Sequence, residues 1–231
     1  MPTWEPRLLE ILQNSTDSAR KASHLYSFPE MVLGTFFRLD IAVLPELLQF
    51  EHVLYTDTDV LFNNDITDMQ GEGLTLPSTI QLAIETPNLA VLNAGVFFAS
   101  MRFLRKTHSG LIQALLSSES IDYGSYGPGD QGLLNMYYEK ELKTVGLLSE
   151  KLFNAKAYSA TNQARIVHFH GPKPSDYEEA VRQGSCERFA ALCGQGLKSE
   201  FHCELFNTWI QYCADECYQY PNLRARCGDK A

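Results

Sequence analysis

The segment from His52 to Phe62 constrains the fold more than any other part of this chain. It begins with a short apolar run, Val53 to Tyr55, and continues with two carboxylates one residue apart, Asp57 and Asp59. An apolar run of this length indicates a strand that is covered on both faces, as in a parallel sheet. In open α/β sheets, ligands collect beyond the carboxyl ends of such strands. The segment therefore predicts an α/β fold with a ligand site directly after this strand.

The two aspartates predict a bound cation. Acidic side chains placed together at a strand end repel each other, and they are costly to desolvate unless a cation joins them. A hard divalent ion that also contacts the phosphates of a ligand would provide this compensation. Because Asp-x-Asp triplets are also common in turns and at helix caps, these residues alone leave the turn interpretation open.

The length and composition predict one sizeable hydrophobic core with a small appendage. The chain has 231 residues, 45% of them hydrophobic, and a formal net charge of −9. This charge and the lack of a basic patch argue against a nucleic-acid partner. No apolar run reaches the roughly 18 residues of a membrane span, and the first residues, Met1 to Arg7, lack the regions of a signal peptide.

All six cysteines lie between Cys186 and Cys227. An even count in a short tail indicates disulfides, and disulfides imply an oxidising compartment. A zinc site is the alternative, but the tail offers only His202 nearby and no paired Cys-x-x-Cys spacing. We favour disulfides and expect the chain in the secretory pathway, in the Golgi lumen.

Hydrophobic periodicity and turn residues predict strands that alternate with helices. Expected helices cover the first part of 7–28, then 29–50, 103–116 and 130–138; expected strands cover 52–56, 79–84, 92–99 and 165–169, with a loop over 121–129. From residue 175 onward the chain is polar, Cys-rich and helical in pattern. We therefore expect a mostly parallel, Rossmann-like sheet flanked by helices over 1–178, and a small Cys-rich helical subdomain over 179–231.

Several short segments follow one another in a characteristic order. They are Thr35–Leu39, which contains Arg38, the Asp57-Thr58-Asp59 triplet, Leu92–Val96, Gly129–Asn135, and His168–Pro174. In this order they resemble glycosyltransferases of the GT-A type, especially the glycogenin and bacterial galactosyltransferase group (glycosyltransferase family 8). The resemblance covers residues 30 to 175. It implies that the N-terminal portion that binds the nucleotide base in this family is missing from the chain.

The resemblance implies transfer of a sugar from a nucleotide-diphosphate sugar, with a UDP-sugar as the expected donor, to a hydroxyl group of a glycan, protein or lipid acceptor. Asp57, Asp59 and His168 are the implied metal ligands, and Mn²⁺ or Mg²⁺ is the implied ion. The ion would act as a Lewis acid on the leaving diphosphate. A core-edge histidine with ordinary hydrogen bonds is the alternative interpretation of His168.

Further residues receive roles from the same resemblance. The implied catalytic residues are Asp130 and Gln131, and the implied substrate-binding residues are Arg38, Thr58, Asn93, Gly95, Gly171 and Lys173. A lysine is a suitable point charge for a diphosphate, and glycine lets a backbone approach phosphates closely. Several of these residues also have an ordinary interpretation: Arg38 as a surface cation, Asp130 as a helix N-cap, and the Gly-Pro and Lys-Pro pairs as turns.

Two other functions compete with a sugar transferase. One is a catalytically inactive GT-A-fold module that binds or scaffolds, an alternative motivated by the short segment before Arg38. The other is a metal-dependent phosphodiesterase or nucleotidyltransferase, which would usually begin with a Gly-rich loop carrying Arg or Lys. This chain begins without such a loop.

Overall fold

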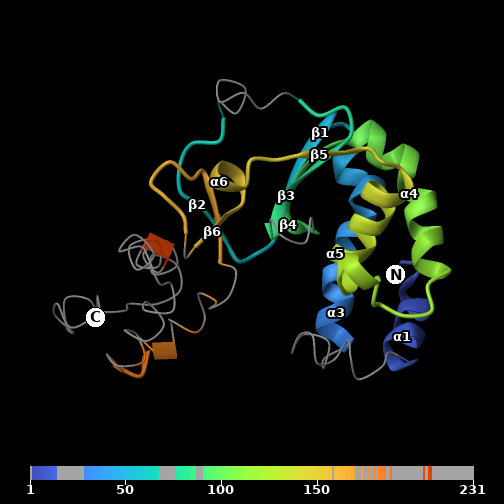
Figure 1. The fold of residues 1–231 in the computed structure, drawn as a ribbon, viewed down its shortest axis with the longest axis horizontal. Coiled ribbons are helices and arrows are strands. Elements are labelled where there is room, and N and C mark those ends of the chain that lie inside the picture. Colours follow the sequence, from blue (N-terminus) through green and yellow to red (C-terminus); the bar gives the residue numbers. More distant parts are fainter. Residues whose placement is uncertain are drawn as a thin grey trace. The chain divides into compact units, whose positions relative to one another are not determined.

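The computed structural model describes residues 2–14, 29–67, 76–86, 91–157 and 159–169, and beyond them 173, 176, 179–180, 182–185, 188, 205 and 208–209. The chain divides into two compact units, which are described separately (Figure 1). Unit 1 comprises Met1–Tyr55 and Leu74–Leu148, and unit 2 comprises Thr56–Gly73 and Ser149–Ala231. All six cysteines lie outside the described residues, so the disulfides and the Cys-rich helical subdomain stay predictions.

The sheet of unit 1 has four strands in the order β1-β4-β3-β5. These are β1 (His52–Thr56), β4 (Val91–Ser100), β3 (Ile80–Thr86) and β5 (Val145–Leu147). Strand β3 pairs antiparallel with β4 and parallel with β5. The link from β3 to β4 is far shorter than the dozen or so residues that a parallel crossover needs, so this pair has to be antiparallel. The α/β class is confirmed, but the sheet is mixed rather than mostly parallel.

The centre of this sheet is β4 rather than β1. All ten residues of β4 are buried, whereas all five residues of β1 are only half-buried. The expectation that the strand at 52–56 is covered on both faces is therefore wrong, although its position is right. The reason is that β1 stands at the end of the sheet, with β4 as its one neighbour among the described strands.

Four α-helices pack together beside this sheet (Figure 1). They are α1 (Glu5–Asn14), α3 (Pro29–Phe36), α4 (Met101–Leu116) and α5 (Gly129–Leu134). The described residues of this unit also form the 3-10 helices η2 (Phe37–Val43), η3 (Pro45–Leu47) and η4 (Gly124–Tyr126) and the π-helix η5 (Asn135–Glu141). The helix predicted over 103–116 is confirmed as α4, and Ser100 caps it by accepting a hydrogen bond from the Phe103 N–H.

The helix predicted over 29–50 is α-helical only as far as Phe36. Tighter 3-10 turns follow it, and they break at Leu44, whose backbone is extended. Proline at position 45 accounts for that break, because its ring disfavours the α conformation in the residue before it. The helix predicted over 130–138 likewise begins as α5 and continues as the π-helix η5.

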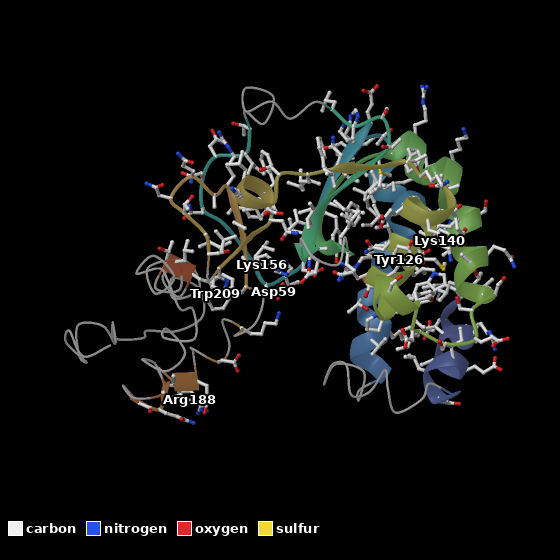
Figure 2. The ribbon with its side chains drawn as sticks, viewed as in Figure 1. Asp59, Tyr126, Lys140, Lys156, Arg188 and Trp209 are labelled. Atoms are coloured by element: carbon white, nitrogen blue, oxygen red, sulfur yellow. The ribbon has the colours of Figure 1, made fainter. Side chains whose placement is uncertain are left out.

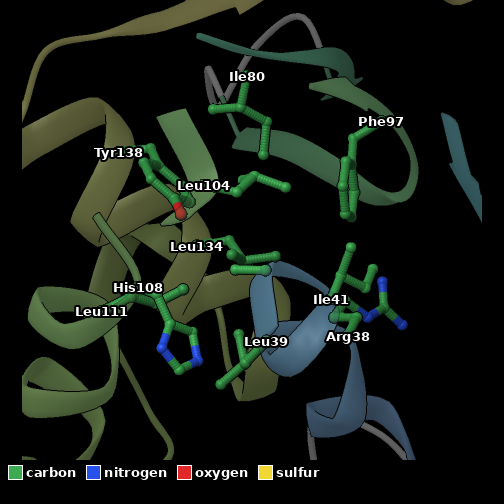
Figure 3. A pocket seen from close by; sticks show the side chains of 11 residues that line it. Arg38, Leu39, Ile41, Ile80, Phe97, Leu104, His108, Leu111, Leu134 and Tyr138 are labelled. Atoms are coloured by element: carbon green, nitrogen blue, oxygen red, sulfur yellow. The ribbon is translucent and has the colours of Figure 1, made fainter. Parts of the chain in front are cut away.

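Asp40 contacts two other polar side-chain groups of unit 1, those of Trp4 and His108. The Asp40 carboxylate accepts a hydrogen bond from Trp4 Nε1 at 3.0 Å and lies 3.1 Å from His108 Nε2. The adjoining cavity in Figure 3 has a volume of about 10 Å³. This is room for at most one water molecule, so the cavity is not a ligand pocket.

A larger hollow lies between β1 and the 3-10 helices of unit 1. It has a volume of about 560 Å³, and Phe37, Leu44 and Phe50 line it. These three side chains are 49%, 41% and 49% exposed. Unlike the cavity of Figure 3, the hollow has room for groups much larger than water.

Unit 2 contains a three-stranded sheet in the order β2-β7-β6. The strands are β2 (Val60–Phe62), β7 (Ile166–His168) and β6 (Ala155–Lys156), and the short helix α6 (Glu150–Phe153) precedes β6. Strand β7 confirms the strand predicted over 165–169. Strands β2, β5 and β6 and helix α6 were not predicted, because two to four residues are too few to show a period. No helix among the described residues has both the length and the apolar character to cross a bilayer.

Gly132 in α5 provides a test of the packing in unit 1. A Cβ at this position would lie 1.9 Å from the backbone oxygen of Gly127. We expect Gly132→Ala to lower the free energy of unfolding by about 1–3 kcal/mol or more, because neither backbone segment can give way easily. Urea denaturation measures this change.

The matched control is Gly34→Ala in α3. A Cβ there meets nothing within 4 Å, and the position is exposed. In a helix interior this change should raise the free energy of unfolding by about 0.5–1 kcal/mol. Equal changes in the free energy of unfolding for the two substitutions would contradict the close approach of Gly132 to the Gly127 backbone.

Candidate metal centre and a second polar cluster

The three predicted metal ligands lie together in unit 2. One ligand atom from each of Asp57, Asp59 and His168 lies within 4.8 Å of the others. The aspartates belong to the link between β1 and β2, where Figure 2 labels Asp59. His168 ends β7, and it stands opposite Val60 in the antiparallel β2–β7 pair. The register of this pair is what brings a distant histidine to the two aspartates.

His168 is held in one orientation by its surroundings. Its side chain is buried, and its Nδ1 lies 3.0 Å from the Oδ1 atom of Asn154, also buried. Because an amide oxygen can only accept, Nδ1 carries a proton and donates a hydrogen bond to Asn154. The Nε2 atom lies 3.3 Å from Asp59 Oδ1. With Nδ1 engaged by Asn154, Nε2 is the ring nitrogen that faces the aspartates and that a cation between them would use.

Lys173 also reaches the candidate metal centre. Its Nζ lies 2.5 Å from Asp59 Oδ2 and donates to the Phe169 carbonyl at 3.1 Å. Burial raises the pKa of Asp59, but hydrogen bonds from His168 and Lys173 and their positive charges outweigh that effect and hold the pKa well below its usual range. Asp59 is therefore an ionised carboxylate. Of the other predicted residues here, Thr58 is exposed and Gly171 lies outside the described residues.

The donor set of this centre fits a divalent cation. Two carboxylates supply the hard oxygen ligands that Mg²⁺ and Mn²⁺ prefer, and an imidazole nitrogen adds preference for Mn²⁺. Asp57, Asp59 and His168 are the residues that would hold the ion. The structure thus contains a possible Asp-Asp-His metal site in the place that the sequence predicted.

A second polar cluster, in unit 1, centres on Arg38 and Asp130. Arg38 Nε lies 2.9 Å from Asp130 Oδ2, and the two side chains are only 6% and 10% exposed. Arg38 Nη1 also donates to the Ala94 carbonyl at 2.6 Å, and the guanidinium lies 4.8 Å from the centre of the Tyr55 ring. Neither ordinary interpretation is right: Arg38 is not a surface cation, and Pro128 rather than Asp130 occupies the N-cap of α5.

Asn93 and Gln131 join the same cluster. Gln131 Oε1 accepts from the Ala94 N–H at 3.0 Å and from Asn93 Nδ2 at 3.3 Å. Asn93 Oδ1 accepts from the Gly95 N–H at 2.9 Å. The predicted residues of unit 1, namely Arg38, Asn93, Gly95, Asp130 and Gln131, are therefore close neighbours. Their roles toward a substrate stay predictions.

Two further residues of this cluster were missed. Asn135 pairs with the backbone N–H and carbonyl of Leu92 at 2.8 and 2.7 Å, which fastens α5 to β4. Its spacing of one helical turn from Gln131 is the signal that could have revealed it. The Glu85 carboxylate accepts from Asn93 Nδ2 at 2.5 Å. The sequence around Glu85 carries no comparable signal.

No protein-family model and no curated protein matches the chain. Solved structures do match it. The chain is similar to the glycosyltransferase GlyE of Streptococcus pneumoniae TIGR4 at 20% identity, over 81% of this chain and 48% of that chain, with a TM-score of 0.49. The apo form of GlyE matches at 20% identity over 77% and 46% of the two chains, with a TM-score of 0.46. An active-site mutant of LgtC matches at 18% identity over 74% and 70%, with a TM-score of 0.43.

The chain thus spans about half the length of the GlyE chains. The chemistry of this chain is therefore inferred from its own residues and not from these structures.

Lys173 provides a test of the candidate metal centre. Because its ammonium group occupies Asp59 and repels any cation, we expect Lys173→Met to raise the affinity for Mn²⁺ in the absence of nucleotide. Lys173 is 48% exposed, so the gain should be modest, roughly two- to fivefold. Isothermal titration calorimetry with Mn²⁺ measures it.

Lys151→Met is the matched control, since Lys151 is an exposed residue of α6 that carries the same charge. Its Mn²⁺ affinity should stay close to that of the wild type. A Lys173→Met variant that binds Mn²⁺ more weakly than Lys151→Met would contradict the arrangement.

The buried Arg38–Asp130 pair predicts strong coupling between two substitutions. Arg38→Met and Asp130→Asn should each lower the free energy of unfolding by about 3–5 kcal/mol, because each leaves a buried group without its partner. The double variant should lose less than the sum of the two. Urea denaturation of the four proteins measures the coupling; additive losses would contradict it. Exposed Arg102→Met is the control, with a change within about 0.5 kcal/mol.

Proposed function

We propose that this protein is a metal-dependent glycosyltransferase that moves a sugar from a nucleotide-diphosphate sugar, with a UDP-sugar as the donor, to a hydroxyl acceptor. The observation that carries the proposal is the convergence of Asp57, Asp59 and His168 on one point in unit 2. The two aspartates repel each other at this point, and a cation held jointly with His168 would compensate that repulsion.

The residues of unit 2 suit the diphosphate end of such a donor. When bound, a divalent cation supplies Lewis-acid stabilisation of the negative charge that develops on the leaving diphosphate. Asp57 and Asp59 offer side-chain oxygen atoms, and His168 offers Nε2 because Nδ1 is engaged by Asn154. The four-carbon stem of Lys173, half exposed, lets its ammonium group turn from Asp59 to a phosphate oxygen.

The polar cluster of unit 1 suits a ligand rich in hydroxyl groups. It presents a carboxylate, two amides and a guanidinium, and its members hold one another in place through the contacts of Arg38 and Gln131. We assign Asp130 and Asn93 to hydroxyl groups of the sugar and Gln131 to the reacting carbon. These assignments rest on the motif order in the sequence. Location in the secretory pathway, which rests on the clustered cysteines, is part of the same proposal.

Asp59→Asn tests the proposed reaction. The substitution keeps the shape of the side chain but removes the charge that would hold the cation. We expect UDP release from a panel of UDP-sugars in the presence of Mn²⁺ to fall by about 100-fold or more, the loss of a few kcal/mol of transition-state stabilisation. A coupled assay for UDP, run with and without sugar acceptors, measures this rate.

Asp65→Asn is the control in the same unit. Asp65 is exposed and hydrogen-bonds within its own turn to Thr67, so its loss should leave the rate unchanged. Tight binding of Mn²⁺ and a UDP-sugar by the wild type without any turnover would instead identify a binding module. If Asp59→Asn turns over at the wild-type rate, the proposed metal-dependent mechanism is wrong.

A further inference from the structure

We propose that Asn154 is a positioning residue that makes His168 a competent cation ligand, an inference that rests on the proposed function. Asn154 Oδ1 lies 3.0 Å from His168 Nδ1, and neither residue is more than 5% exposed. Asn154 belongs to no segment that marked the site in the sequence, because it lies 14 residues before His168.

The chemical reason is the choice between two tautomers of a neutral imidazole. A histidine can bind a cation through Nε2 only if Nε2 carries a lone pair, and that requires the proton on Nδ1. The amide oxygen of Asn154 accepts that proton in a hydrogen bond and so favours this tautomer. Because this hydrogen bond fixes the ring at Nδ1, Nε2 faces the Asp59 carboxylate before any cation binds.

The backbone around Asn154 keeps the amide in place. Asn154 ends α6, and its N–H donates to the Glu150 carbonyl at 3.3 Å. The next two residues form β6, which pairs parallel with β7, so that Lys156 stands opposite His168. The Ala157 N–H donates to the His168 carbonyl at 3.0 Å. His168 thus ends β7, and its amide partner directly precedes β6, the neighbouring strand of the same sheet.

This buried pair has an alternative explanation as a simple structural hydrogen bond. A structural bond would matter for folding but would leave the cation affinity of a folded variant unchanged. A positioning bond has to fix the proton on Nδ1 of His168 and has to change the affinity for the cation in a protein that remains folded. The cation affinity therefore separates the explanations, and the state of Nδ1 tests the bond itself.

The test uses the full chain and Mn²⁺ alone as the probe. Asn154→Leu replaces the amide by an apolar group of similar size, and we expect the Mn²⁺ affinity to fall about 10- to 100-fold by calorimetry. Asn154→Asp keeps an acceptor oxygen toward Nδ1 and should recover most of the wild-type affinity. Asn162→Leu is the matched control, because Asn162 is exposed in unit 2 and its change should leave the affinity unaltered.

Nitrogen-15 NMR of the imidazole groups gives the second readout in the metal-free protein. The wild type should show a protonated Nδ1 in the His168 ring, and Asn154→Leu should show a His168 population whose Nδ1 carries no proton. This spectrum of the wild type tests the inference even if Asn154→Leu does not fold. A His168 ring without a proton on Nδ1 in the wild type would overturn the inference.

The outcomes separate this inference from the proposed function. Undiminished Mn²⁺ affinity in a folded Asn154→Leu variant, together with metal-dependent transfer by the wild type, would overturn the role of Asn154 alone. Failure of the wild type to bind Mn²⁺ at all would overturn the proposed function and the role of Asn154 with it.

Discussion

The antiparallel pairing of β2 with β7 is the interaction on which the candidate metal centre depends. It places His168 opposite Val60, directly after Asp59, and the Phe169 N–H donates to the Asp59 carbonyl at 2.9 Å. A shift of this pairing by one residue would turn the imidazole to the other face of the sheet, because successive side chains alternate between faces. The pairing therefore decides whether three side chains make one site or are merely three polar residues.

The polar groups of the two units are stabilised in different ways. In unit 1 the charge of Asp130 is balanced within the protein by Arg38, and both side chains are almost fully buried. In unit 2 the two aspartates and His168 converge with one lysine, which is itself half exposed on a flexible stem. The first arrangement is suited to holding a fixed geometry. The second is suited to exchanging a protein cation for a bound one.

The sequence was most informative where a chemical group and its local structure coincide. The strand at 52–56, the buried strand interrupted by Asn93 and Gly95, and the helix at 103–116 are all present, because their patterns are long or end in distinctive polar residues. The sequence was least informative about pairing. It did not predict the mixed sheet, the 3-10 turns after Phe36, or the short strands β2 and β6 that hold His168, since segments of two or three residues take their structure from their neighbours.

By itself, the sequence determined which polar side chains are candidates for a ligand site, because the chemical character of Asp57, Asp59, Asp130 and His168 lies in the side chains themselves. Only the tertiary structure decided which of them meet, and with which partners. Asn154 is the clearest case: an ordinary asparagine at a helix end becomes the hydrogen-bond partner of His168 because β6 and β7 lie side by side. Strand pairing depends on contacts between residues far apart in the chain, and no local pattern of residues encodes them.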